Sequence, residues 1–420
     1  MKFLVVADDY PWPARSGYRQ RLHWVVRTLA GLGTVDLLVV RDEPLADPPN
    51  PPSDVRLGRT EVVTAGYAAR SSVSRALRWL LSARPRRLVG QDWAPAREAV
   101  QRWAEDEYDL VWFAHSPTYL ALRDRLPAPH VVDLDNLESS MAHLRRLGRG
   151  RRSSPRSLPR HLASAAADLL DERLWERVEE RVAGAARVTV VCSELDRGRL
   201  AGPRVAVLSN GYELPDRPGG APAPPPRSVT GGPVLLFVGL LTYEPNRDAV
   251  AFFAQDVLPL IRVHRPDVRF RVVGHHGADL VAAVSGRGVE LAGEVPDVTA
   301  ELAGADLVVV PLRFGGGTRI KVLEAFAHGV PVVSTRVGCE GLDVEDGRHV
   351  LLADDPRALA DSCLRLLDDA DRGAVLSSHA RELWQRQYRW TVIAPTVDGI
   401  VRAAVGRADP EGRGPRGGRT

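Results

Sequence analysis

A run of three glycines followed at once by charged residues is the part of this sequence best suited to chemistry. The run is Gly315–Gly317, and Arg319 and Lys321 follow it at the start of an expected helix. Glycine has no Cβ, so its backbone can approach a ligand closely. The free amides at a helix N-terminus bind anions, and the positive end of the helix dipole favours them. The segment therefore predicts an anion site of the kind that a phosphate group needs.

The helix that follows the glycines is apolar on nearly all sides, so we expect it to be buried. Its polar residues recur three, three and four positions apart, which places them on one stripe: Thr318, Lys321, Glu324 and His328. This stripe indicates either a ligand cleft or a structural Lys321–Glu324 ion pair at spacing i, i+3. Lys321 is one of only two lysines among 56 basic residues, which favours a role for a compact ammonium at this position.

The elements that position these residues are short apolar runs alternating with helical stretches, a pattern typical of parallel sheets covered by helices on both faces. In the first half the expected strands are Lys2–Ala7, Val35–Val40, Asp109–Ala114, His130–Leu134, Arg187–Cys192 and Arg204–Leu208. The main expected helices between them are Tyr18–Leu32, Ala94–Glu105 and His161–Ala183.

A Pro- and Gly-rich segment, 215–232, interrupts the pattern and predicts a linker between an N-terminal domain, 1–214, and a C-terminal domain, 233–390. The alternation then restarts, with strands expected at Val234–Gly239, Arg269–Gly274, Val289–Leu291, Asp306–Pro311 and Pro331–Thr335. Helices are expected from Asn246, from Thr318, from Pro356 to about Trp390, and over 391–405; the tail, 406–420, is expected to be disordered. Two such domains place a cleft at the carboxyl ends of both sheets, where α/β folds bind ligands.

Several function classes are excluded by missing motifs. The sequence has no phosphate-loop motif, no G-x-G-x-x-G after its first strand, no G-x-S-x-G and no H-E-x-x-H. Its three isolated cysteines predict neither a disulfide framework nor a metal site. The apolar stretch Phe3–Ala7 is too short for a signal peptide, and no run reaches membrane-span length. We expect a cytoplasmic protein, and a net charge of +3 is too small to indicate nucleic-acid binding.

The segment Ala305–Val337 resembles the donor-binding motif of GT-B fold glycosyltransferases, specifically the retaining glycosyltransferase family 4 (glycosyl transferases group 1). FVGLLTYEPNRDAVAFF at 237–253, VLSNGYE at 207–213 and QYRWTVIAPTVDGIV near the C-terminus are also similar to that family. The resemblance implies an α/β GT-B architecture of two Rossmann-like domains, with a C-terminal helix that crosses back to the N-terminal domain. It further implies a nucleotide-diphosphate sugar as co-substrate, with no cofactor and no metal.

The resemblance also implies roles for single residues in the C-terminal domain. Glu324 matches the family's second motif glutamate, which holds the ribose hydroxyls, whereas Gly316 stands where the family has its first glutamate. The family's usual basic pair after the first strand of this domain is not evident, so we expect Lys321 and Arg319 to carry the diphosphate charge. The remaining donor-binding residues are expected to be Gly239, Phe314, Gly315, Gly316, Gly317 and Thr318.

In the N-terminal domain the resemblance places Gly17 near the donor phosphates and His115 at the donor sugar, although an ordinary turn glycine and a structural histidine are alternatives. Asp135, Asn136 and Glu138 follow another strand and are expected to bind the acceptor, unless some of them are helix caps. Asp133 and Asp135 form a D-x-D, the metal motif of the other glycosyltransferase fold, but two α/β domains argue against that fold.

Two basic stretches of the N-terminal domain, 69–91 and 143–160, contain six and seven arginines and no acidic residue. They indicate either solvated loops or a peripheral contact with the inner face of the membrane. The predicted function is a glycosyltransferase of hexosyltransferase type, with a sugar-containing or small-molecule acceptor and a role in polysaccharide or natural-product biosynthesis. A sugar-nucleotide epimerase, a sugar phosphorylase and a catalytically silent nucleotide-sugar binder are the alternatives.

Overall fold

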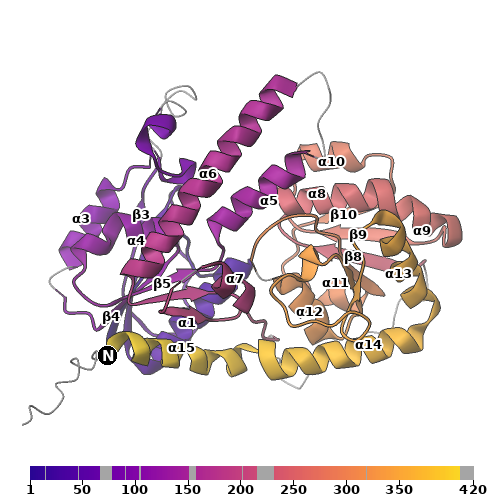
Figure 1. Ribbon diagram of the computed structural model, residues 1–420. Coiled ribbons are helices and arrows are strands. Elements are labelled where there is room, and N and C mark those ends of the chain that lie inside the picture. Colours follow the sequence, from indigo (N-terminus) through magenta and orange to yellow (C-terminus); the bar gives the residue numbers. More distant parts are fainter. Residues whose placement is uncertain are drawn as a thin grey trace, which may run out of the picture.

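The computed structural model describes residues 1–14, 16–45, 47–66, 78–89, 91–103, 106–150, 158–200, 202–214, 231–317 and 319–406. These form two α/β lobes side by side, joined along one edge by the C-terminal helices (Figure 1). Most of the predicted linker and tail lie outside the described residues, so the predicted domain boundary at 215–232 stays a prediction.

The N-terminal lobe contains a seven-stranded parallel sheet in the order β3-β2-β1-β4-β5-β6-β7. Its strands are β1 (Lys2–Ala7), β2 (Thr34–Arg41), β3 (Leu57–Thr64), β4 (Leu110–Ala114), β5 (His130–Leu134), β6 (Val188–Val191) and β7 (Val205–Val207). Its helices are α1 (Gly17–Leu32), α3 (Ala94–Trp103), α4 (Ser116–Leu122), α5 (Glu138–Gly150), α6 (Leu158–Ala185) and α7 (Glu194–Arg199). Central strands such as β4 are buried along their whole length, as expected for a sheet covered on both faces.

The C-terminal lobe contains a six-stranded parallel sheet in the order β10-β9-β8-β11-β12-β13. Its strands are β8 (Val234–Val238), β9 (Arg269–Val273), β10 (Val289–Gly293), β11 (Leu307–Val310), β12 (Val332–Ser334) and β13 (Leu351–Leu352). Its helices are α8 (Glu244–Phe252), α9 (Leu258–His264), α10 (Ala278–Val284), α11 (Thr299–Ala303), α12 (Ile320–His328), α13 (Pro356–Asp368) and α14 (Ala370–Leu383).

The last helix, α15 (Trp390–Val405), leaves the C-terminal lobe and packs on α1, as predicted (Figure 1). Trp390 stacks on Trp24 with ring centroids 5.9 Å apart, and the apolar side of α15 joins the N-terminal core. The indole nitrogen of Trp384 donates to the carbonyl of Tyr212, which follows the N-terminal sheet. The C-terminal helices therefore connect the two lobes independently of the linker.

The predicted strands of both lobes are confirmed within one or two residues at each end. The sequence misses β3, because this edge strand (LGRTEVVT) has no buried residue and so lacks an apolar run. The helical stretch predicted from Pro356 to about Trp390 divides at Asp369, whose side chain accepts from the Arg372 amide and caps α14. Within the described ranges, no helix combines the length and the apolar composition needed to cross a bilayer.

Candidate functional site between the two lobes

The glycine run forms the connection between β11 and α12 and faces the N-terminal lobe. Gly315 and Gly317 have φ angles of +129° and +76°, in the region that favours glycine. A Cβ at Gly316 would lie 2.6 Å from Sδ of Met141, and one at Gly317 would lie 2.0 Å from Oδ1 of Asn136. Both contacts cross between the lobes, so glycine allows them to approach this closely.

Lys321 lies in the first turn of α12 and points toward the end of β8. Its Nζ donates to Oδ1 of Asn246 at 2.6 Å and lies 4.3 Å from the ring centroid of Phe237. A Cβ at Gly239 would lie 2.9 Å from this nitrogen. Burial, together with the nearby Arg319 charge, lowers the pKa of Lys321 to about 7, against the opposing effect of Glu324. Among the described residues no carboxylate contacts this half-buried ammonium, which is therefore suited to binding an anion.

Glu324 occupies the next position along the same stripe. Burial raises the pKa of its carboxyl to about 7, although Lys321 and a hydrogen bond from Gln20 of α1 both oppose this. The contact with Gln20 places Glu324 at the boundary between the lobes. Lys321 and Glu324 of the predicted polar stripe therefore face the space between the lobes.

Arg319 requires a correction. The sequence predicts its guanidinium on the diphosphate, but the structure turns this side chain back into its own lobe, where it is 5% exposed. It donates to the carbonyl oxygens of Gly315 at 2.6 Å and of Val337 at 3.2 Å, and also to that of Gly316. The reason is that Arg319 is the N-cap of α12 and has non-helical backbone angles. In this arrangement it supports the shape of the glycine loop.

The other residues predicted at the donor site have different surroundings. Phe314 is buried immediately before the glycine loop. Gly17 begins α1, and a Cβ there would lie 2.9 Å from Cδ1 of Ile320 in the opposite lobe. Thr318 lies outside the described residues. Gly17 therefore lies directly against the start of α12, as its predicted position near the donor phosphates requires.

His115 lies between β4 and α4 with a φ angle of +76°, uncommon for a non-glycine residue. Its Nδ1 is 3.0 Å from both carboxylate oxygens of Asp8, and its ring stacks on Tyr18 with centroids 4.4 Å apart. Burial opposes the charged imidazolium, but the Asp8 carboxylate outweighs this and raises the pKa of His115. Although burial would raise the pKa of Asp8, His115 and Arg87 lower it to about 2.

Two of the three predicted acceptor residues contact other side chains of the N-terminal lobe, and the acceptor role of all three stays a prediction. Asp135 is buried and accepts from Nδ2 of Asn210 at 2.7 Å. Glu138 pairs with Arg87. Asn136 packs against Gly317, and its buried Oδ1 has no hydrogen-bond partner among the described residues.

The D-x-D aspartates are also held by protein donors. Arg21, a buried residue of α1, binds both oxygens of Asp133, with Nη2 to Oδ1 at 2.7 Å, and donates to the carbonyl of Leu208 and to Asn210. Sequence reasoning missed Arg21, and only its place on the buried side of α1 could have signalled it. Among the described residues no cluster of three or more His, Cys, Asp or Glu side chains is arranged to hold a metal ion.

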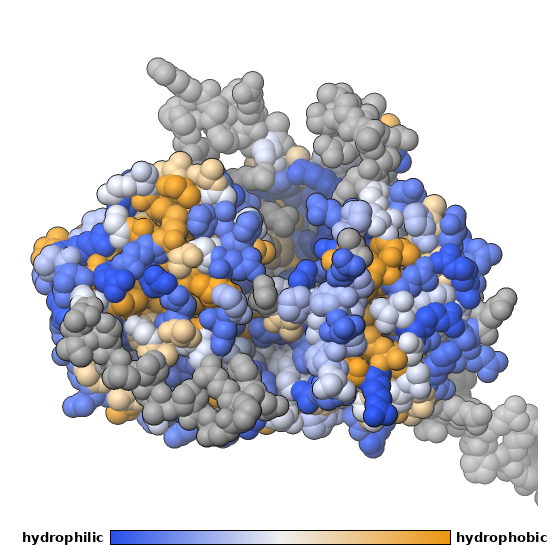
Figure 2. All heavy atoms as spheres, turned by 180° about the vertical axis from the view of Figure 1, so that it is seen from behind, coloured by the Kyte–Doolittle hydropathy of each residue, from blue (hydrophilic) through white to orange (hydrophobic). Residues whose placement is uncertain are grey.

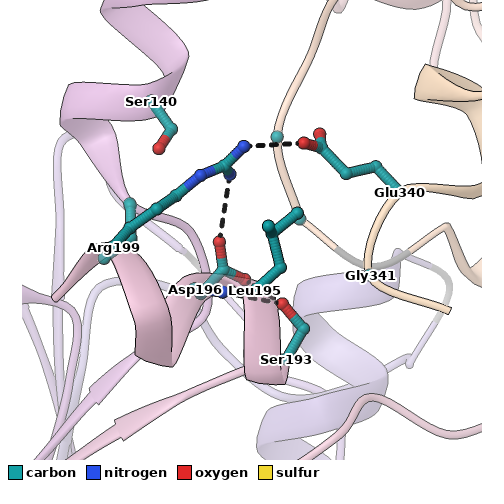
Figure 3. Close-up of a pocket in the computed structure, with 10 residues that line it drawn as sticks. Ser140, Ser193, Leu195, Asp196, Arg199, Glu340 and Gly341 are labelled. Carbon is teal, nitrogen blue, oxygen red and sulfur yellow. Dashed lines mark hydrogen bonds and ion pairs between the residues drawn. The ribbon is translucent and has the colours of Figure 1, made fainter.

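A groove opens beside the glycine loop, between α5 and α7 of one lobe and the loop after β12 of the other (Figure 3). Its lining residues are Leu137, Ser140, Ser193, Leu195, Asp196, Arg199, Gly316, Gly317, Glu340 and Gly341. Nη2 of Arg199 donates to Oε1 of Glu340 at 2.7 Å, across the two lobes. Seen from behind, the molecule has a hollow between its lobes, and small groups of hydrophobic residues lie among hydrophilic ones on both (Figure 2).

Comparison with known proteins agrees with the fold, and a family match falls on the C-terminal lobe. Residues 232–369 match the family described as Glycosyl transferases group 1. A D-inositol 3-phosphate glycosyltransferase of Arthrobacter sp. (strain FB24) is 37% identical over 146 residues, which are 30% of this chain and 34% of that protein. The chain thus aligns with only about a third of that relative's length.

Solved structures match over nearly the whole chain. Sucrose-phosphate synthase from Thermosynechococcus elongatus has a TM-score of 0.65 at 17% identity, covering 96% of this chain and 98% of that one. Anabaena Alr3699/HepE in complex with UDP-glucose has a TM-score of 0.65 at 15% identity, covering 96% and 99%. At these identities the likeness shows the fold, and it confirms the predicted GT-B architecture of two Rossmann-like domains.

Proposed function

We propose, from the GT-B fold and from the glycosyl transferases group 1 domain at 232–369, that this protein is a glycosyltransferase. It moves a hexose from a nucleotide-diphosphate sugar to an acceptor hydroxyl. The observation that carries the proposal is the half-buried ammonium of Lys321 in the first turn of α12, which contacts Asn246 and lies beside Gly239. A nucleotide diphosphate supplies the anion that this arrangement lacks.

Stabilisation of the leaving group is the chemistry that this site performs. Transfer breaks the bond between the anomeric carbon and a phosphate oxygen, so negative charge grows on the diphosphate. The Lys321 ammonium and the amides at the start of α12 stabilise that negative charge. Each such group typically increases turnover by a factor of 10²–10³, which corresponds to roughly 2.7–4 kcal/mol. Arg319 contributes indirectly, by holding the carbonyls of the glycine loop.

The transfer proceeds without a metal ion in this proposal. The two oxygens of Asp133 already bind the Arg21 guanidinium, and Asp135 accepts from Asn210. A D-x-D whose carboxylates are held by internal donors is poorly suited to binding a cation. The positive charges at the start of α12 therefore stabilise the leaving diphosphate, as a divalent ion does in metal-dependent sugar transfer.

Two further residues complete the proposed donor site. Glu324 accepts hydrogen bonds from the ribose hydroxyls, in keeping with its place on the Lys321 stripe. His115 binds the donor sugar through Nε2, since Asp8 occupies Nδ1. Among the described residues no side chain is placed as an enzymatic nucleophile. Retention by front-face attack, assisted by the leaving phosphate, is therefore proposed from the resemblance to retaining family 4 enzymes.

A peripheral membrane contact remains part of the proposal. Leu80 and Leu81, in the described part of the first basic stretch, are 60% and 79% exposed, and Arg84 beside them is exposed too. Adjacent exposed leucines and arginines suit the boundary between headgroups and acyl chains. Part of the second stretch, 151–157, lies outside the described residues.

The test is release of UDP from UDP-hexoses, starting with UDP-glucose, the donor named for the HepE complex. Wild type, Lys321→Ala and a matched control, Arg365→Ala on the exposed side of α13, are compared for turnover. We expect the control to match wild type and Lys321→Ala to lose 10²–10³ in turnover. No release from any nucleotide hexose, or full activity of a folded Lys321→Ala, would contradict the proposal.

A further inference from the structure

Met141 is the only methionine of the sequence apart from the first residue, and it joins the two lobes. It lies in the first turn of α5 and is buried. Its Sδ fills the space beside Gly316, since a Cβ at Gly316 would lie 2.6 Å from this atom. The hydroxyl of Tyr243, at the start of α8, donates to the same sulfur at 3.4 Å. One side chain of the N-terminal lobe thus contacts two segments of the C-terminal lobe.

The glycine loop has a single shape only where its surroundings hold it, because glycine loses more backbone freedom on ordering than any other residue. Arg319 holds the loop from the C-terminal lobe by donating to the carbonyls of Gly315 and Gly316. A Cβ at Gly315 would lie 3.1 Å from Cβ of Pro245, so α8 borders the loop as well. Further support comes from the N-terminal lobe, through Met141.

The start of α5 is itself fixed by α6. Glu179, a buried residue of α6, accepts from the backbone amide of Ser139 at 3.1 Å and also from the Ser139 hydroxyl. The two helices pack along each other (Figure 1). Met141 therefore projects toward the glycine loop from an anchored helical turn, and its contact with Gly316 can transmit the position of the N-terminal lobe to the loop.

We propose that Met141 is a positioning residue for the donor: its contact with Gly316 holds the glycine loop in the form in which the loop amides meet the diphosphate. A loop that is already rigid in its bound form costs less to order on binding, so affinity rises. The inference rests on the proposed glycosyltransferase function and makes donor binding by the C-terminal lobe depend on the N-terminal lobe. In this role Met141 acts through the loop and not on the diphosphate itself.

The first test is the affinity of the full chain for UDP, measured by calorimetry. Met141→Ala should weaken UDP binding about tenfold, which is the effect of losing the order of roughly one loop residue. Met141→Leu conserves the volume of the side chain and should restore affinity to within about threefold of wild type. Leu174→Ala, which truncates a buried leucine of α6, is the matched control and should bind UDP as wild type does.

A size swap tests the contact itself. The φ angle of Gly316 lies outside the positive range that favours glycine, so alanine fits the backbone and its Cβ meets the Met141 side chain. Gly316→Ala alone should therefore weaken UDP binding. In the double variant with Met141→Ala, the new Cβ occupies part of the space that the methionine leaves. The double variant should bind UDP more tightly than either single variant.

Urea unfolding checks that each variant is folded. The inference is overturned if folded Met141→Ala keeps wild-type affinity for UDP, if Met141→Leu is as weak as Met141→Ala, or if Leu174→Ala loses as much affinity as Met141→Ala. Simple additivity of the Met141→Ala and Gly316→Ala effects would overturn it too. Failure of the proposed function is a distinct result, because wild type itself would then bind no UDP.

Discussion

Binding of UDP is predicted to draw one proton from solution at pH 8, and Lys321 is the group that takes it up. In the free protein, burial and the Arg319 charge lower the pKa of Lys321 to about 7. A diphosphate beside Nζ favours the ammonium and returns the pKa toward its ordinary value, above 10. The sign is therefore uptake of a proton on binding, at any pH between these two values.

The size of the effect follows from the two protonation states. At pH 8 a group with a pKa of about 7 is about one-tenth protonated, so near-complete protonation on binding takes up about 0.9 proton. At pH 6 the same group is already about nine-tenths protonated, and uptake falls to about 0.1. Glu324, with its pKa also raised to about 7, is mostly ionised at pH 8 and adds little. Each pH unit above 7 should weaken UDP binding about tenfold, or about 1.4 kcal/mol.

Isothermal titration calorimetry at pH 8, in buffers that differ in ionisation enthalpy, measures this uptake directly. Lys321→Arg is the matched control, because arginine stays protonated and should bind UDP without proton uptake. Uptake below about 0.2 proton for wild type, or the same uptake for Lys321→Arg, would refute the assignment of Lys321 to the diphosphate.

Other perturbations test the rest of the site. Glu324→Ala should weaken UDP binding by roughly 1.5–3 kcal/mol, the range for a hydrogen bond to a charged group, as measured by the same calorimetry. Asp8→Asn removes the carboxylate that raises the pKa of His115 and should lower that pKa, which an NMR titration of the imidazole protons would follow; an unchanged midpoint would contradict the dyad. EDTA should leave sugar transfer nearly intact, whereas activity lost and then restored by manganese would return the D-x-D to a metal role. Arg21→Met leaves Asp133 buried without its partner and should cost roughly 3–5 kcal/mol of unfolding free energy, measured with urea.

The fold was readable from the sequence because buried parallel strands have nearly continuous apolar runs. The strand at 307–310 and the helix at 320–328 are both of this kind, so their order and the glycine loop between them could be predicted. The polar stripe was readable for the same reason: Lys321 and Glu324 stand out on a helix that is otherwise apolar. Strand β3 lacks that signal, since its residues are exposed or only half-buried at the sheet edge.

Contacts between side chains that are far apart in the sequence could not be predicted. Asp8 and His115 are 107 positions apart, and Arg199 and Glu340 are 141 apart, so only the folded arrangement of the lobes brings them together. The orientation of the Arg319 side chain could not be predicted for a different reason. Arg319 was placed in the first turn of a helix, but as the N-cap of α12 it has φ and ψ angles of −84° and 76°, and its side chain turns back onto the carbonyls of the glycine loop.

The departure at Gly316 from the resembled family pattern has a physical reason in the way the lobes meet. Any side chain there would begin 2.6 Å from Sδ of Met141, so a glutamate would require at least the Met141 side chain to move. Glycine therefore permits this close contact, and it also removes a carboxylate from the donor-sugar side of the cleft. Hydroxyls of the donor sugar must then find their partners in the loop backbone or in the N-terminal lobe, where His115 is fixed by Asp8. We therefore expect the sugar specificity of the proposed glycosyltransferase to depend more on the N-terminal lobe than on the glycine loop.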